Sequence, residues 1–157
     1  MAIQSGRKNK KVNTKKWEIF LKRSADIFAK RILNPKWKPR NTAEAFFISP
    51  LMLSYQLLGN DQYKLAAIKA ADYYANRHLS MDEPYWGGTL NATCEDKEGA
   101  WGAFQGFLSV YELTHNSKYL KYAKHACDVV LSYAVVWDIP LPPGRLADDI
   151  QTGNLFK

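Results

Sequence analysis

The sequence has only two cysteines in 157 residues, which excludes a scaffold held together by disulfides. No run of 18 or more apolar residues occurs, so no segment is expected to cross a membrane. The N-terminus lacks the apolar stretch of a secretory signal peptide, and we therefore expect a cytoplasmic protein. The cysteines and the three histidines lack the spacing of a zinc site, and no phosphate-binding glycine loop is present, so no metal or cofactor is expected.

Basic residues are unevenly distributed along the chain. Residues 1–40 carry 13 basic and two acidic side chains, a net charge of +11, whereas residues 41–157 carry a net charge of −4. The basic segment at residues 1–40 can contact nucleic acid or a membrane surface. Alternatively, it is a solvated segment followed by a helix with a charged outer face. Because no aromatic stacking motif accompanies the charge, we do not expect nucleic acid as a partner.

Apolar residues recur with helical spacing throughout, and no stretch alternates with the period of a strand. The fold class is therefore predicted to be all-α. Thr14, Gly59 and either Asn116 or Ser117 are expected as helix caps, and Pro50 is expected to kink the second helix. The predicted helices span residues 15–33, 42–58, 60–78, 99–114 and 116–136.

The chain repeats itself with a shift of 56 residues, at which Tyr63 corresponds to Tyr119 and Asp72 to Asp128. The first helix matches the second half of this unit, with Trp17 at the position of Tyr63. The repeating unit is a helix, a tight turn and a second helix, so the chain contains half a hairpin followed by two complete hairpins. A fixed period of this size indicates an architecture in which each unit buries its face on its neighbours.

The two helices of each unit differ in character. Residues 43–58 and 99–114 are apolar nearly all round and are expected to be inner helices, whereas residues 61–78 and 117–136 carry charges on one face and are expected to be outer helices. An inner apolar layer wrapped by an outer amphipathic layer describes an α/α toroid. In a partial toroid, flanks of the inner helices should be exposed.

Three long loops follow the outer helices, at residues 34–42, 79–98 and 137–157, and each contains a tryptophan. All three should lie where the inner helices begin. Acidic residues cluster at the same end, with Glu44 just after the first loop. Aromatic faces beside carboxylates suit a sugar ring, although such tryptophans can also simply pin a long loop to the core. The expected substrate-binding residues are Trp37, Tyr85, Trp86, Glu95, Trp137 and Asp138.

Two acidic residues, Asp96 and Glu98, lead directly into the helix at 99–114. A carboxylate gains stability at the N-terminus of a helix, so one of them can cap the helix while the other reaches a cleft. We take both as candidate catalytic residues; the alternative is that they act only as caps.

Three segments resemble the six-hairpin glycosidase superfamily, the (α/α)6 toroids: Tyr85-Trp86-Gly87-Gly88, the stretch from Glu98 to Thr114, and the pattern from Tyr119 to Asp128. The resemblance implies a carbohydrate-active protein that takes an oligosaccharide or a polysaccharide-derived substrate. Members of that superfamily are hydrolases that use paired carboxylates, and relatives are lyases or epimerases.

Six hairpins at the 56-residue period would need about twice the length of this chain, which holds about two and a half hairpins. Either the product is a truncated toroid or a partner chain completes the ring. The alternatives to a glycoside hydrolase are a non-catalytic helical-repeat module for protein interaction and a nucleic-acid binder. We divide the chain into a flexible basic arm, a toroid-hairpin fragment and an irregular C-terminal tail: residues 1–14, 15–140 and 141–157.

Overall fold

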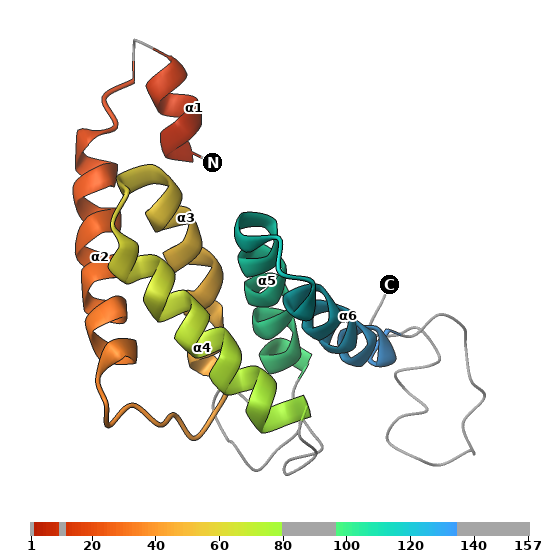
Figure 1. Ribbon diagram of the computed structural model, residues 1–157. Coiled ribbons are helices and arrows are strands. Elements are labelled where there is room, and N and C mark those ends of the chain that lie inside the picture. The colour runs from red at the N-terminus through yellow and green to blue at the C-terminus, as the bar shows by residue number, and fades with distance from the viewer. Residues whose placement is uncertain (1, 10–11, 80–96, 135–157) are drawn as a thin grey trace, which may run out of the picture.

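The computed structural model describes residues 2–9, 12–79 and 97–134, and every element in these three stretches is a helix. This confirms the all-α prediction. Neighbouring helices run in alternating directions from α2 onwards (Figure 1). The elements are α1 (Ala2–Lys8), α2 (Lys15–Leu33), the 3-10 helix η1 (Ala43–Phe47), α3 (Ile48–Leu58), α4 (Asp61–Leu79), α5 (Lys97–Thr114) and α6 (Ser117–Ser132).

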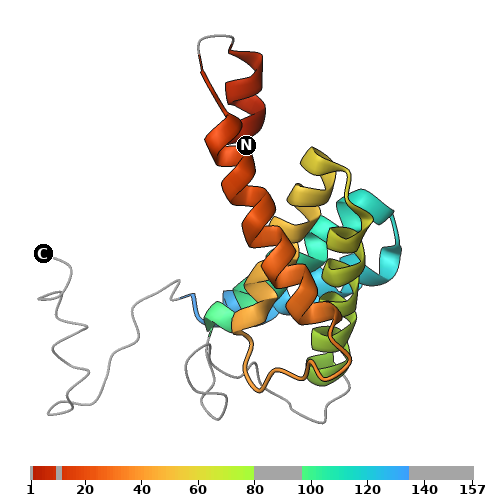
Figure 2. The same cartoon turned by 90° about the vertical axis from the view of Figure 1, so that its left-hand side faces the viewer.

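The helices form two hairpins, α3–α4 and α5–α6, with α2 packed against the first. Helix α3 contacts α5, and α4 contacts α2, so the hairpins lie side by side with α2 at one edge and α6 at the other (Figures 1 and 2). Helices α3 and α5 are not enclosed on every side, because Leu53 and Trp101 have large exposed fractions.

Local signals in the sequence set the ends of the hairpin helices. Gly59 ends α3 in the left-handed conformation with φ of 71°, which glycine adopts without a steric cost. The Asn116 side chain accepts a hydrogen bond of 3.1 Å from the backbone N–H of Lys118 and so caps α6. Thr14 precedes α2 as expected, but its hydroxyl donates to Glu18 at 2.7 Å and makes no capping bond.

The single kinked helix predicted for residues 42–58 is wrong, because the structure divides this stretch into η1 and α3. Pro50 therefore lies in the first turn of α3, where its missing N–H removes no bond within the helix. The carbonyl of Pro50 instead accepts a hydrogen bond of 2.7 Å from the Ser54 hydroxyl.

Within the arm of residues 1–14, the structure has helix α1, which the sequence analysis did not predict. The guanidinium of Arg7 contacts the Glu18 carboxylate at 2.8 Å, and hydrogen bonds from Arg7 and Thr14 lower the pKa of Glu18 to about 2. A Cβ atom at Gly6 would lie 2.5 Å from the methyl group of Thr14, so only glycine fits this contact. These contacts dock α1 on the first turn of α2.

Small residues allow the helices to approach closely. On α5, a Cβ atom at Gly106 would lie 2.8 Å from Cβ of Ile48, and one at Gly102 would lie 3.0 Å from the ring of Phe46. The backbone of α5 itself therefore packs against η1 and α3. On α4, the buried face consists mainly of alanines: Tyr63, Ala66, Ala67, Ala70, Ala71, Tyr74 and Ala75.

Candidate functional site

The two ends of the bundle differ in kind. The loop of residues 34–42 and the first turns of η1 and α5 lie at one end, whereas the short turns after α3 and α5 lie at the other (Figure 1). We call the first of these the loop end. It carries two of the residues selected from the sequence, Trp37 and Glu98.

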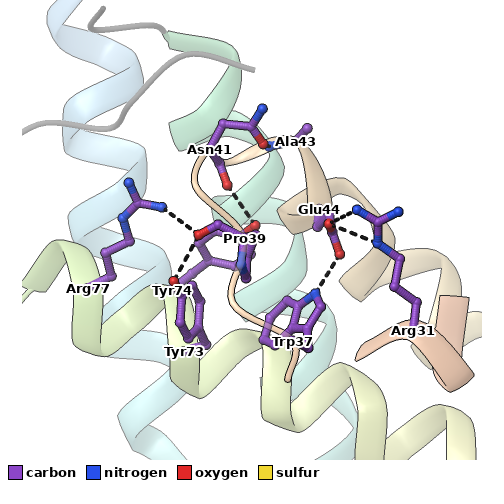
Figure 3. A network of polar contacts seen from close by, with 9 residues as sticks. All are labelled: Arg31, Trp37, Pro39, Asn41, Ala43, Glu44, Tyr73, Tyr74 and Arg77. Carbon is purple, nitrogen blue, oxygen red and sulfur yellow. Dashed lines mark hydrogen bonds and ion pairs between the residues drawn. The ribbon is translucent and has the colours of Figure 1, made fainter. Parts of the chain in front are cut away.

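Side chains of α4 fix the second half of the 34–42 loop by holding its carbonyl groups. The Tyr73 hydroxyl donates to the carbonyl of Pro39 at 2.9 Å, and the Tyr74 hydroxyl donates to the carbonyl of Asn41 at 3.0 Å (Figure 3). The guanidinium of Arg77 also donates to Pro39, at 3.3 Å. Burial raises the pKa of Tyr74, so its hydroxyl remains a donor at neutral pH.

Trp37 lies at the centre of this loop and makes contacts on several sides. Its ring centroid lies 4.9 Å from that of Tyr73, and its indole N–H donates to Oε2 of Glu44 at 2.6 Å (Figure 3). The ammonium of Lys69 lies 5.7 Å from the centroid of the Trp37 ring, within the range of a cation–π interaction. Trp37 therefore pins the loop to α4, and its partly buried ring also lines a surface pocket.

The carboxylate of Glu44 is buried and engaged at both oxygens. Its Oε1 accepts hydrogen bonds from Nη2 and Nε of Arg31, at 2.6 and 3.1 Å, while Oε2 takes the indole N–H of Trp37 (Figure 3). The hydrogen bonds to Glu44 raise the pKa of Arg31. Glu44 thus ties the end of α2, the loop and the start of η1 together.

A surface pocket of about 310 Å³ opens beside this network. It joins an aromatic ring, an amide, one carboxylate and three cationic side chains. Such a set can stack on one face of a ring, hydrogen-bond hydroxyl groups and attract an anionic group. The lining residues are Arg31, Asn34, Lys36, Trp37, Lys38, Pro39 and Glu44.

Glu98 is the one catalytic candidate within the described residues, and it is exposed in the first turn of α5. A carboxylate there interacts favourably with the helix N-terminus. The remaining candidates lie outside the described residues, and their grouping with Trp37 and Glu98 stays a prediction: Tyr85, Trp86, Glu95, Asp96, Trp137 and Asp138.

The residues that orient Trp37 were not predicted from the sequence; they are Arg31, Glu44 and the two tyrosines of α4. One signal was present in the sequence, since Arg31 and Arg77 occupy equivalent positions at the ends of matching helices. Both arginines now hold the 34–42 loop region, Arg31 through Glu44 and Arg77 through Pro39.

No family model, curated protein or solved structure matches the chain. Within the described stretches 2–9, 12–79 and 97–134, no group of three or more histidine, cysteine or acidic side chains could hold a metal ion. In the same stretches, no helix has the combination of length and apolar character needed to span a membrane.

Proposed function

We propose that the chain is a carbohydrate-active protein built from hairpins of an α/α toroid, and that it binds an acidic saccharide at the loop end. The observation that carries this proposal is the pocket beside Trp37, where an indole ring lies among cationic side chains and an engaged carboxylate. The proposal extends the resemblance to six-hairpin glycosidases, which rests on sequence patterns.

The charge of the pocket favours an acidic sugar over a neutral one. Arg31, Lys36 and Lys38 line it against the single carboxylate of Glu44, and that carboxylate is already paired with Arg31. A uronate carboxylate would find charge-assisted hydrogen bonds from the lysines, while its ring C–H groups pack on Trp37. Asn34 adds the NH2 group of its side chain as a donor to a hydroxyl group, while its side-chain oxygen accepts from the backbone N–H of Lys36.

Catalysis is proposed for Asp96 and Glu98, as the acid and base of glycosidic bond cleavage. The start of α5 lies at the same end of the bundle as the pocket, so a chain of several sugar units bound at Trp37 could extend towards Glu98 (Figure 1). A completed ring would bring further residues to that end, and we propose that a partner chain or additional hairpins supply them.

Calorimetric titration with oligouronides and with neutral oligosaccharides of equal length tests the binding proposal. We expect the wild type to bind the oligouronide more tightly, and Lys38→Ala to weaken that binding roughly tenfold through loss of one charge-assisted contact. Lys64→Ala is the matched control, because Lys64 lies over the ring of Tyr55 near the start of α4, at the end of the bundle opposite the loop end. Equal binding of both sugars, or an equal effect of both variants, would contradict an acidic saccharide in this pocket.

Cleavage is tested separately by following the release of reducing ends from the oligosaccharide that binds. Glu98→Gln and Asp96→Asn are expected to abolish release without weakening binding. Turnover that persists in both variants would remove these residues from the catalytic role and leave the binding proposal in place.

A second candidate function, a non-catalytic helical-repeat module for protein interaction, is favoured by a different observation. Helix α2 exposes large apolar side chains, Phe20 and Ile27 among them, on a face that no described element covers. A pull-down with immobilised wild type and with Ile27→Glu as bait separates the two candidates. Retention of specific proteins by the wild type alone, with no saccharide binding, would favour the interaction module.

A further inference from the structure

The outer helices are joined by a hydrogen bond that repeats along the chain. The Tyr63 hydroxyl on α4 donates to Oδ1 of Asp26 on α2 at 2.6 Å, and the Tyr119 hydroxyl on α6 donates to Oδ1 of Asp72 on α4 at 3.0 Å. These four residues occupy equivalent positions in the repeat. We call each pair a tyrosine–aspartate link; each one connects an outer helix to the outer helix before it.

A lysine reinforces each link. Lys22, one turn before Asp26 on α2, contacts Oδ2 of Asp26 at 2.7 Å. Lys118, on α6, contacts Oδ1 of Asp72 at 2.9 Å. Hydrogen bonds from Lys22 and Tyr63 lower the pKa of Asp26. The aspartate of each link therefore accepts from two donors, one tyrosine and one lysine.

The same register position on α6 is occupied by Asp128, which is exposed. Lys124 precedes it by four residues, as Lys22 precedes Asp26. No tyrosine in the described part of the chain donates to Asp128, and no outer helix lies beyond α6 there. Among the described residues, Asp128 is thus an acceptor at the position of Asp26 and Asp72 that receives no hydrogen bond from a tyrosine.

An apolar position of the repeat is also buried on α2 and α4 but exposed on α6. Ala29 on α2 and Ala75 on α4 are 3% and 2% exposed, whereas Leu131, their equivalent on α6, is 60% exposed. Leu131 lies one turn after Asp128. We call the surface formed by Asp128 and Leu131 the α6 edge.

At the opposite side of the array, α2 presents the complementary half of the link. Trp17 occupies the position of Tyr63 and Tyr119, and its indole N–H is a hydrogen-bond donor like their hydroxyls. Trp17, Phe20 and Ile27 are 46%, 73% and 65% exposed and form one stripe along the helix, in which the Trp17 ring also packs beside Gly6 of α1. We call these three residues the α2 edge.

We propose that the α6 edge of one copy docks on the α2 edge of a second copy, with the Trp17 indole donating to Asp128. The contact repeats the two tyrosine–aspartate links across two chains, in the same register and with the same kind of donor and acceptor. The two edges lie on opposite sides of the array, so one chain cannot join them to each other (Figures 1 and 2). The contact is therefore head-to-tail and makes a ring or an open filament.

The proposal does not depend on saccharide binding, because the edges are formed by outer helices and the pocket is formed by the 34–42 loop.

Sedimentation equilibrium at increasing concentration tests the proposal. The wild type is expected to exceed the monomer mass, whereas Phe20→Glu and Leu131→Glu, each with one edge blocked, are expected to remain monomers. Mixed in equal amounts, the two variants still offer one intact α6 edge and one intact α2 edge, so they should form a dimer and nothing larger. Asp128→Ala should weaken association roughly tenfold, because it removes the acceptor for the Trp17 indole N–H.

Leu65→Glu is the matched control, because Leu65 is a half-exposed leucine of the middle outer helix, and it should associate like the wild type. Circular dichroism establishes that each variant is folded, and Ile27→Glu replaces Phe20→Glu if the latter is not. A wild type that stays monomeric, or a mixture of blocked variants that stays monomeric, overturns the proposal.

Discussion

Helices α2 and α4 have the same length of 19 residues and matching sequences, yet they are buried to very different degrees. Seven of the described residues of α4 are buried, whereas α2 buries only Ala25, Ala29 and Ile32. The difference comes from their neighbours, because α4 lies between α2 and the second hairpin, whereas α2 has the first hairpin on one side only. The same helix type is thus an interior element at one place in the array and an edge at another.

The side chains at equivalent positions follow this difference. Ala66 and Ala70 on α4 are fully buried, and their counterparts on α2 are Phe20, which is exposed, and Ser24. Within one chain, small side chains let a neighbouring helix approach, whereas bulky apolar ones stand at the edge of the array. Every outer helix therefore keeps the register of the repeat, but the close-packing alanines are found where a helix of the same chain lies alongside.

The largest difference in stability is expected between two single variants that place a carboxylate at the same position of the repeat, one in α4 and one in α2. Ala70→Asp buries a carboxylate without a partner and should lower the free energy of unfolding by about 3 kcal/mol or more. Ser24→Asp, at the equivalent position of α2, should change it by less than about 0.5 kcal/mol. Urea denaturation of both variants measures the contrast, and equal losses would mean that the two positions are equally enclosed.

A smaller effect is expected from removing one hydroxyl from each tyrosine–aspartate link. Tyr63→Phe and Tyr119→Phe each delete a single hydrogen bond to a carboxylate and should each lower the free energy of unfolding by about 1 kcal/mol. The double variant should show the sum of the two losses, because the links lie on opposite sides of α4. Thermal or urea unfolding gives these values, and a neutral Tyr63→Phe would remove the link as a stabilising contact.

The smallest effect concerns α1, which covers only the first turn of α2. The pKa of Glu18 is about 2 in the folded chain and about 4.3 in an unfolded one, so its contact with Arg7 stabilises the docked state above about pH 4.3. As the pH falls towards 2, Glu18 takes up a proton and the contact is lost. We expect NMR signals of Gly6 and Trp17 to report undocking over this range while α3 to α6 keep their signals.

Glu18→Gln supplies the control for this titration. The variant lacks the charged contact at every pH, so its Gly6 and Trp17 signals should show no transition between pH 5 and pH 2. A transition of unchanged midpoint in Glu18→Gln would assign the effect to another group.

Features set by short-range signals could be predicted from the sequence. The helical period and the caps at Gly59 and Asn116 fix the two hairpins within a few residues, because each signal acts within one turn of its own helix. The division at η1 and the docking of α1 could not be predicted in this way. The latter depends on contacts such as Arg7 with Glu18, which lie 11 residues apart.

In the candidate site, too, the sequence predicts single residues but not the contacts that depend on tertiary packing. Trp37 was selected from its place in a long loop, but its orientation depends on Glu44, Tyr73 and Arg31, which belong to three other elements. Such an arrangement follows only from the packing of α2, η1 and α4 around the loop. The glycosidase resemblance and the roles of Asp96 and Glu98 stay predictions, and the turnover experiment addresses them.

The main contacts of the array join elements that are close together in the chain. Even the links between outer helices span fewer than 50 residues, Tyr63 to Asp26 and Tyr119 to Asp72. Chains with mostly local contacts fold quickly, and arrays held by nearest-neighbour interfaces can open from their ends one unit at a time. Amide protons of α4, enclosed on two sides, should therefore exchange with solvent more slowly than those of α2 and α6, which lie where opening begins.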